Sequence, residues 1–319
     1  MKVVYSELCL AHDPAYEIYD GKKEPYAEKA DRLRAIEQAL RAVENVLFVS
    51  PHTFSDRCLM TLHQKEYISF IEKRSNSLSP NDILYPSYFI ADTYTPIVHD
   101  TYLSARSAVD VALTGARLLL RGESLVYSLT RPPGQHASYK AMSGYCYFNN
   151  TAISANYLSE EGKVAILDID LHHGNGTQEL FYERSDVMYV SIHADPHEKF
   201  PYNSGFADER GKGQGLGYTR NYPLPVGTND RGYLPVLQKA LRNIRSFNPE
   251  FLVVSAGFDT YAQDPIGAFA LTLPFYEIMG REISSLGVPT LLVQEGGYNV
   301  QDLGTMAVNF VKGFTENTT

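Results

Sequence analysis

The stretch KVAILDIDLHHGNG, residues 163–176, contains the pattern that determines the fold. An almost continuous apolar run is followed at once by acidic residues, histidines and glycines. An apolar run without alternation is typical of a strand covered on both faces, as in the middle of a parallel sheet. The polar residues then fall at the carboxyl end of the strand, which is where ligands bind in open α/β sheets.

Four more short, apolar and β-branched runs occur along the chain: SLVYSL (124–129), VMYVSIH (187–193), FLVVSAGFD (251–259) and VPTLLVQEGGY (288–298). We expect helices between the five runs, at 151–161, 232–246 and 274–286. Strands that alternate with helices predict an α/β fold with a parallel sheet. Because no repeat, low-complexity tract or Gly/Ser linker interrupts the chain, we expect a single domain over residues 1–319.

Composition limits the possible functions. With 44% hydrophobic residues, the chain is able to bury a sizeable core. A net charge of −9 argues against non-specific binding to nucleic acid and is compatible with cationic ligands. No apolar stretch is long enough for a signal peptide or a membrane span, so we expect a cytoplasmic protein with no membrane partner. Three scattered cysteines predict reduced thiols.

Polar, reactive residues end four of the five predicted strands: RPPGQH (131–136), DIDLHHG (168–174), SAGFD (255–259) and QEGGY (294–298). The carboxyl ends of parallel strands lie at one edge of a sheet. We therefore expect these four segments, which are distant in sequence, to converge into one site.

The second and third of these segments supply candidate metal ligands. On an extended strand end, Asp168, Asp170 and His172 occupy alternate positions and point to the same side. Asp170, His172 and Asp259 together offer carboxylate oxygens and an imidazole nitrogen, which suit zinc, and three protein ligands leave room for water and substrate. The alternatives are that the acids cap a helix or bind a structural ion.

The first and fourth segments supply candidates for proton transfer and charge stabilisation. Gln135 and His136 are adjacent, but only an imidazole takes up a proton near neutral pH, so His136 is the candidate general base. Tyr298 follows two glycines and is a candidate donor to an oxyanion. The alternatives are an ordinary surface histidine and a structural Gly-Gly-Tyr turn.

The complete set of motifs resembles the histone deacetylase superfamily. RPPGQHA, GYCYFNN, ILDIDLHHGNGTQELFY, YVSIHADP, NYPLPVGT, SAGFDTYAQDP and EGGYN occur in this order over nearly the whole chain. EIYDGK, FYERSDV, GKGQGLG and DPIGAFALT resemble its bacterial acetylpolyamine amidohydrolases. The resemblance implies an arginase/deacetylase-like fold, with a single central parallel sheet of about eight strands flanked by helices. It also implies a zinc-dependent amidohydrolase that releases acetate from N-acetylated amines.

The resemblance also assigns roles to individual residues. It implies zinc ligation by Asp170, His172 and Asp259, proton transfer by His136, and polarisation of the acetyl carbonyl by Tyr298. It implies a potassium ion beneath the zinc, held by Asp168, Asp170, Ser191 and the backbones of His172 and Ile192. Asn175 would orient the imidazole, and the substrate tunnel would be lined by Tyr145, Phe200, Gly144 and, near its rim, Ile266.

Gln135 departs from the family's pattern, which has a tandem His-His pair at this point. The histidine that transfers protons is retained, so we expect the chemistry to persist. Loss of a group that contacts the nucleophilic water typically lowers the rate by roughly tenfold to a thousandfold. A native glutamine that shifts the pH optimum and an engineered substitution that traps substrate both fit this sequence.

The predicted substrate is a small cationic acetylated amine. The second cationic end of an acetylpolyamine favours acids at the tunnel mouth, and Asp92, Asp195 and Glu198 are the candidates, against the alternative of ordinary solvated carboxylates. The irregular stretch 76–102 is expected to narrow the entrance of the tunnel.

By the resemblance we expect a homodimer. Alternatives are a protein or peptide lysine deacetylase, an arginase-like dinuclear hydrolase, and an acetyl-ligand binder made inert by Gln135.

Overall fold

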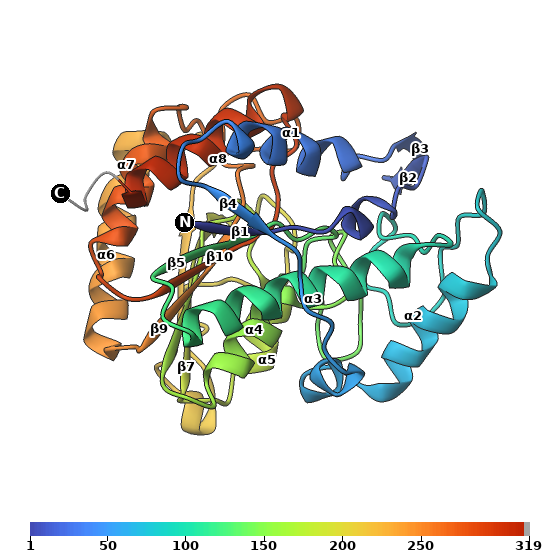
Figure 1. The fold of residues 1–319 in the computed structure, drawn as a ribbon, viewed down its shortest axis with the longest axis horizontal. Helices are drawn as coiled ribbons and strands as arrows, with labels where there is room; N and C mark the ends of the chain where they lie inside the picture. Colours follow the sequence, from blue (N-terminus) through green and yellow to red (C-terminus); the bar gives the residue numbers. More distant parts are fainter. Residues whose placement is uncertain (316–319) are drawn as a thin grey trace.

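A computed structural model describes residues 1–315 and shows a central sheet with helices on both faces (Figure 1). The sheet has eight strands in the order β4-β1-β5-β10-β9-β6-β7-β8, and all neighbours are parallel. The predicted α/β class and the parallel sheet of about eight strands are confirmed. The last four residues of the predicted domain lie outside the described part.

The strands of this sheet are β1 (Lys2–Val4), β4 (Leu47–Val49), β5 (Leu125–Ser128), β6 (Val164–Asp168), β7 (Val187–Ala194), β8 (Thr219–Leu224), β9 (Phe251–Ala256) and β10 (Thr290–Gln294). A separate antiparallel hairpin is formed by β2 (Tyr16–Tyr19) and β3 (Lys22–Pro25). The helices are α1 (Ala30–Arg41), α2 (Lys65–Ser77), α3 (Thr101–Leu120), α4 (Asn150–Leu158), α5 (Asn175–Phe181), α6 (Asp230–Phe247), α7 (Phe275–Ser284) and α8 (Val300–Thr315).

All five apolar runs form strands, but three other strands of the sheet escape the sequence pattern. Two of these, β1 and β4, are only three residues long, which is too short for a recognisable run. The third, β8, reads TRNYPL and includes Pro223. It is an edge strand, and a proline is tolerated there because the missing N–H has no partner strand to bind.

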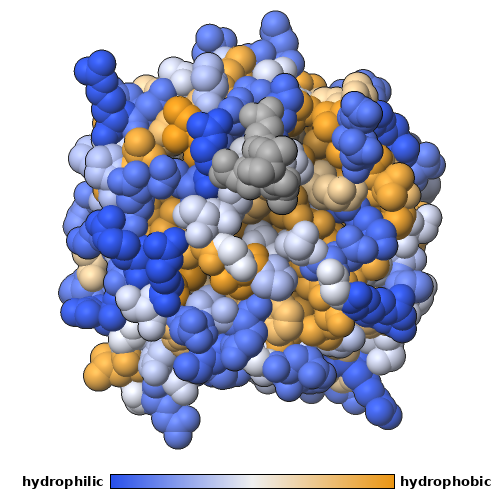
Figure 2. Space-filling model, turned by 60° about the vertical axis from the view of Figure 1, so that its left-hand side comes forward, coloured by the Kyte–Doolittle hydropathy of each residue, from blue (hydrophilic) through white to orange (hydrophobic). Residues whose placement is uncertain are grey.

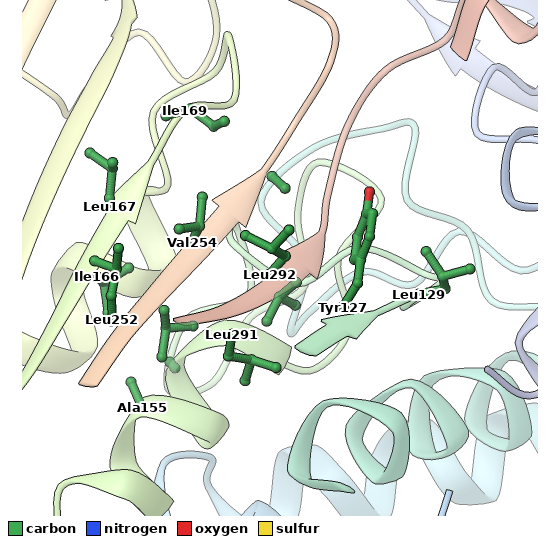
Figure 3. Close-up of a cluster of buried hydrophobic side chains, with 14 of the residues drawn as sticks. Tyr127, Leu129, Ala155, Ile166, Leu167, Ile169, Leu252, Val254, Leu291 and Leu292 are labelled. Carbon is green, nitrogen blue, oxygen red and sulfur yellow. The ribbon is translucent and has the colours of Figure 1, made fainter. Parts of the chain in front are cut away.

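The buried core explains why the central strands have continuous apolar runs. Neighbouring residues in register form two rows across β6, β9, β10 and β5: Leu167, Val254, Leu292 and Tyr127 in one row, and Ile166, Val253, Leu291 and Val126 in the other. Successive residues of a strand point to opposite faces, and both rows are almost completely buried (Figure 3). Each face of the sheet is therefore covered.

The sheet order brings the four polar segments together. The strands that precede them, β5, β10, β9 and β6, are consecutive neighbours in the sheet. Because the strands are parallel, their carboxyl ends lie at the same edge. The expected convergence is confirmed.

The surface has mixed polarity. Figure 2 shows hydrophilic residues over most of the face that it views, with hydrophobic residues scattered between them. Among residues 1–315, no helix has the length and apolar character that crossing a membrane would require.

Candidate active site

Asp170, His172 and Asp259 lie side by side at the carboxyl edge of the sheet. Their ligand-capable atoms are all within 4.8 Å of one another. His172 Nδ1 is 2.9 Å from Asp259 Oδ2 and 3.4 Å from Asp170 Oδ1. The structure thus assembles, from loops that follow β6 and β9, the three residues selected from the sequence.

The loop after β6 differs from its predicted conformation. The strand ends at Asp168, and the next residues turn instead of continuing as an extended strand. A carboxylate oxygen of Asp168 accepts a hydrogen bond from Asp170 N–H at 3.2 Å, and one of Asp170 accepts from His172 N–H at 2.9 Å. Aspartate side chains stabilise turns in this way. The extended conformation predicted for this segment is therefore not found, whereas Asp170 and His172 do lie together as predicted.

Backbone donors hold the two carboxylates of the cluster in place. Asp170 Oδ2 accepts from Gly296 N–H, and Asp259 Oδ1 accepts from Leu171 N–H, each at 2.8 Å. A side chain at Gly257 would collide with Asp170 Oδ2, so this position requires glycine. The cluster is fixed by the turns around it.

The electrostatics of the cluster favour a cation. Burial lowers the pKa of His172, but hydrogen bonds to Asp170 and Asp259 outweigh this and raise the pKa to about 10. Burial and the neighbouring Asp170 raise the pKa of Asp259, and the contact with His172 opposes this rise. Two buried carboxylates thus stabilise positive charge on the imidazole. A divalent ion held by the same oxygen and nitrogen atoms would supply that charge instead, and the donor set fits zinc.

His136 is oriented as a base. Its Nδ1–H donates to Asn175 Oδ1 at 2.8 Å, which places the lone pair on Nε2, the atom that would take up a proton. Burial, followed by the nearby charge on His172, lowers the pKa of His136 to about 4, so the ring is neutral at pH 7. Its ring packs edge to face on Phe200, with 4.9 Å between centroids.

The side-chain amide of Gln135 contacts the atom of this imidazole that would take up the proton. Its side chain is only 2% exposed, and its Nε2 is 3.4 Å from His136 Nε2. Its Oε1 is buried and has no hydrogen-bond partner within residues 1–315. Since buried polar atoms normally have a partner, this oxygen is an unused acceptor on a side chain that contacts the predicted base.

Tyr298 is held by a cation on one side and by an aromatic ring on another. The guanidinium of Arg32 lies 4.6 Å from the centroid of its ring, and the centroid of Tyr145 is 5.9 Å away. Burial raises the pKa of Tyr298 well above its usual value, so the phenol keeps its proton and remains a donor.

A cavity of about 420 Å³ lies next to the predicted base, the metal cluster and the tyrosine. Its lining includes His136, His172 and Tyr298, and also the predicted tunnel residues Tyr145, Phe200, Ile266 and Gly144. Gly144 has a φ of +54°, and a side chain there would collide with the ring of His136. Glycine at this position therefore lets the imidazole pack against the cavity wall.

Asp92 and Asp195 do not line this cavity, contrary to their predicted place at the mouth. Asp92 Oδ2 accepts from Gly144 N–H at 2.5 Å and from Thr95 Oγ1 at 2.9 Å, so it anchors the loop between α2 and α3. Asp195 accepts from His197 Nδ1 at 2.8 Å on the exposed surface. Of the three predicted acids, only Glu198 lines the cavity.

Several lining residues were missed by sequence reasoning. Glu17, Tyr19 and Glu24 come from the β2–β3 hairpin, and Tyr94 comes from the predicted long loop. Glu17 accepts from Tyr145 O–H and from Ala27 N–H, each at 3.1 Å. The Asp-Gly pair at 20–21 has positive φ at both residues and is a strong hairpin signal, so the hairpin itself was predictable.

The residues expected to hold potassium lie on β6 and β7, next to the cluster in the chain. Asp168 and Ser191 are paired in register between β6 and β7 and are fully buried. Asp168 Oδ2 accepts from Tyr189 O–H at 2.8 Å, and Ser191 Oγ is 2.7 Å from His193 Nδ1. Ile192 follows on the same strand.

Comparison with known proteins identifies the family. The histone deacetylase domain matches residues 26–314. Two relatives are each 38% identical to this chain over 98% of its length: acetylpolyamine amidohydrolase 2 of Pseudomonas aeruginosa and acetylpolyamine amidohydrolase of Mycoplana ramosa. The match covers 98% of the first relative and 99% of the second. A crystal structure of acetylpolyamine aminohydrolase from Burkholderia pseudomallei superposes with a TM-score of 0.94 at 34% identity, covering 98% of both chains. The protein therefore belongs to the histone deacetylase domain family.

Proposed function

We propose that the protein is a zinc-dependent amidohydrolase that removes the acetyl group from small N-acetylated amines, in particular acetylpolyamines. The observation on which this rests is the convergence of the Asp170, His172 and Asp259 cluster, His136 and Tyr298 around one cavity. The names of the full-length relatives agree with this substrate class.

Each group around the cavity has a part in the reaction. Asp170, His172 and Asp259 would hold the zinc, which when bound supplies a Lewis acid for the acetyl carbonyl and lowers the pKa of water. His136 Nε2 takes a proton from the attacking water and returns it to the leaving amine. The phenol of Tyr298 donates a hydrogen bond to the oxyanion that develops on the acetyl carbonyl.

The lining of the cavity supports a cationic substrate. Glu17, Glu24 and Glu198 contribute three carboxyl groups against the single amine of Lys199, and four tyrosine rings also line the cavity: Tyr19, Tyr94, Tyr145 and Tyr202. Carboxylates and aromatic faces both stabilise ammonium groups. The second amine of an acetylpolyamine would lie among these side chains.

A potassium ion would be bound by Asp168, Asp170, Ser191 and the backbones of His172 and Ile192. Its charge would offset the negative charge of the buried carboxylates.

The chain would act in the cytoplasm as a homodimer. The loop between α2 and α3, where Tyr88 is 53% exposed, is the surface on which we expect the second subunit.

The test is acetate release by the zinc-loaded protein from acetylputrescine, acetylspermidine and an acetyl-lysine peptide at equal concentration. The proposal predicts turnover of the two small amines and little turnover of the peptide. Faster turnover of the peptide would favour a lysine deacetylase instead. No acetate from any of the three, with zinc bound, would contradict the hydrolase assignment and favour an acetyl-ligand binder.

A further inference from the structure

Glu295 is a fully buried carboxyl group that the proposed chemistry does not use. It follows β10, three residues before Tyr298. Its Oε2 accepts hydrogen bonds from the backbone N–H groups of Gly134 and Gln135, at 2.7 and 3.2 Å. The side chain therefore connects the segment of Tyr298 to the backbone just before His136.

The other oxygen of the same carboxyl group is also bound. Glu295 Oε1 accepts from Thr151 Oγ1 of α4 at 2.9 Å and from Ser255 Oγ of β9 at 3.3 Å. Donors from the histidine loop, from a helix and from a strand thus surround the group. With both oxygens bound, the carboxyl group has little freedom to rotate.

The histidine loop, RPPGQH, has few other means of attachment through its backbone donors. Its two prolines have no N–H, so the N–H groups of Gly134 and Gln135 are the first available after Arg131. Glu295 binds both of them. The carbonyl oxygen of Gln135 accepts from Thr177 N–H at 3.1 Å on the other side of the loop. Glu295 therefore fixes the donor side of the backbone that leads into His136.

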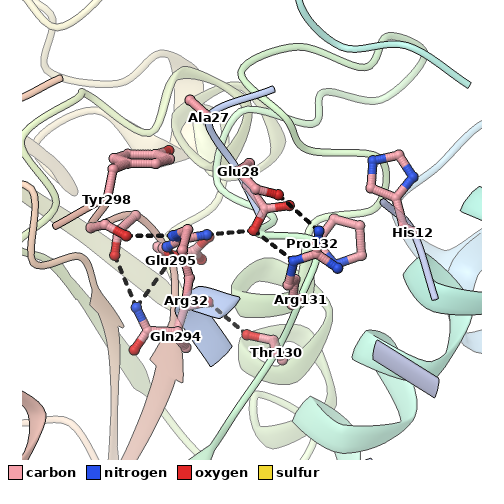
Figure 4. Close-up of polar contacts among 12 residues, drawn as sticks. His12, Ala27, Glu28, Arg32, Thr130, Arg131, Pro132, Gln294, Glu295 and Tyr298 are labelled. Carbon is pink, nitrogen blue, oxygen red and sulfur yellow. Dashed lines mark hydrogen bonds and ion pairs between the residues drawn. The ribbon is translucent and has the colours of Figure 1, made fainter. Parts of the chain in front are cut away.

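A second connection between the same segments runs through charged side chains (Figure 4). Glu28 Oε1 lies 2.5 Å from Arg32 Nη1 and 2.9 Å from Arg131 Nε. Arg32 in turn donates to the backbone oxygens of Glu295 and Gly297, and Arg131 begins the histidine loop. This path uses three side chains in series, whereas Glu295 binds the loop directly.

We infer that Glu295 is a positioning residue, whose two hydrogen bonds to the histidine loop fix His136 relative to Tyr298. The inference rests on the proposed hydrolase function, in which both groups act on one substrate. The role requires an acceptor oxygen at the distance from the backbone that Glu295 provides. Burial raises the pKa of Glu295, while the hydrogen bonds from Gly134, Thr151 and Gln135 oppose this. Glutamine has the same shape as glutamate and keeps an acceptor oxygen on the side of the loop.

The test compares Glu295→Gln with Glu295→Asp in the zinc-loaded, full-length protein. Gln keeps an oxygen that accepts both hydrogen bonds, so kcat should stay within about threefold of wild type. Asp keeps the charge but is one methylene shorter, so the loop and His136 should shift. A misplacement of a catalytic group by near 1 Å costs on the order of a hundredfold in kcat. KM and bound zinc should be unchanged in both. Wild-type kcat in the Asp variant, or an equal loss in the Gln variant, would overturn the inference.

Thr151→Val is the matched control, because it removes a donor to the other oxygen and leaves both loop amides bound. We expect its kcat to stay within about threefold of wild type, and a loss as large as that of Glu295→Asp would contradict the positioning role.

Hydrogen exchange at the N–H groups of Gly134 and Gln135 gives a readout independent of turnover. Exchange should accelerate in Glu295→Asp and match wild type in Glu295→Gln. Equal protection in all three proteins would overturn the inference. If the wild type releases no acetate, the hydrolase proposal fails, while the exchange result still decides whether Glu295 anchors the loop.

Discussion

The floor and the rim of the cavity are built in different ways. The floor is formed by His136, His172 and Tyr298, with Asp170 and Asp259 clustered around His172. These residues lie in the segments that follow four neighbouring strands. The rim comes from the β2–β3 hairpin, the loop between α2 and α3, the loop after β7 and the segment around Ile266 after β9. The difference shows that the sheet determines which reaction is possible, while the connecting segments determine which amine enters.

The largest expected effect is at the floor. Asp259→Ala removes one of three ligands, so bound zinc should be lost and turnover should fall by roughly a thousandfold or more. Metal content by elemental analysis and acetate release check this. Asp195→Ala, on the exposed surface, is the control and should retain both. Stoichiometric zinc in Asp259→Ala would remove Asp259 from the ligand set.

Tyr298→Phe should separate charge stabilisation from metal binding. Loss of one donor to an oxyanion typically lowers kcat by about a hundredfold to a thousandfold. Bound zinc should be unchanged, because the phenol is not one of the three clustered ligands. An unaffected kcat would exclude Tyr298 from the mechanism.

Gln135→His tests the departure from the tandem histidine pattern. A second imidazole would be able to hydrogen-bond the attacking water, so we expect kcat to rise by about tenfold. The pH dependence of kcat should change with it. If kcat does not rise, Gln135 already serves this water as well as an imidazole does, and its free Oε1 is the acceptor to test next.

The smallest expected effect is at the rim. Glu198→Gln should raise KM for acetylspermidine by only about two- to fivefold, because an exposed charge pair is worth roughly 0.2–1 kcal/mol. KM for an acetylated amine without a second charge should not change. Asp195→Asn is the matched control, since Asp195 is exposed nearby but lies outside the cavity lining. Equal changes for both substrates would mean that Glu198 does not recognise the cation.

The floor of the cavity could be predicted from the sequence, whereas most of the rim could not. Apolar strands and the polar residues after them are local patterns, so the parallel sheet and the convergence of its strand ends were predictable. Glu17 was not, because its role depends on a contact with Tyr145, 128 residues away. Asp92 was placed at the mouth because it is an acid in a loop, whereas its hydrogen bonds are to the loop itself and to Gly144.

The central claim is that a single zinc site, on the floor of the cavity, is required for the hydrolysis. Titration of metal-free protein with zinc, with acetate release from acetylputrescine measured at each step, tests it most directly. The account predicts no activity without metal and a linear rise that ends at one zinc per chain. Full activity in the absence of metal, or a rise that ends only at two zinc ions per chain, would contradict it.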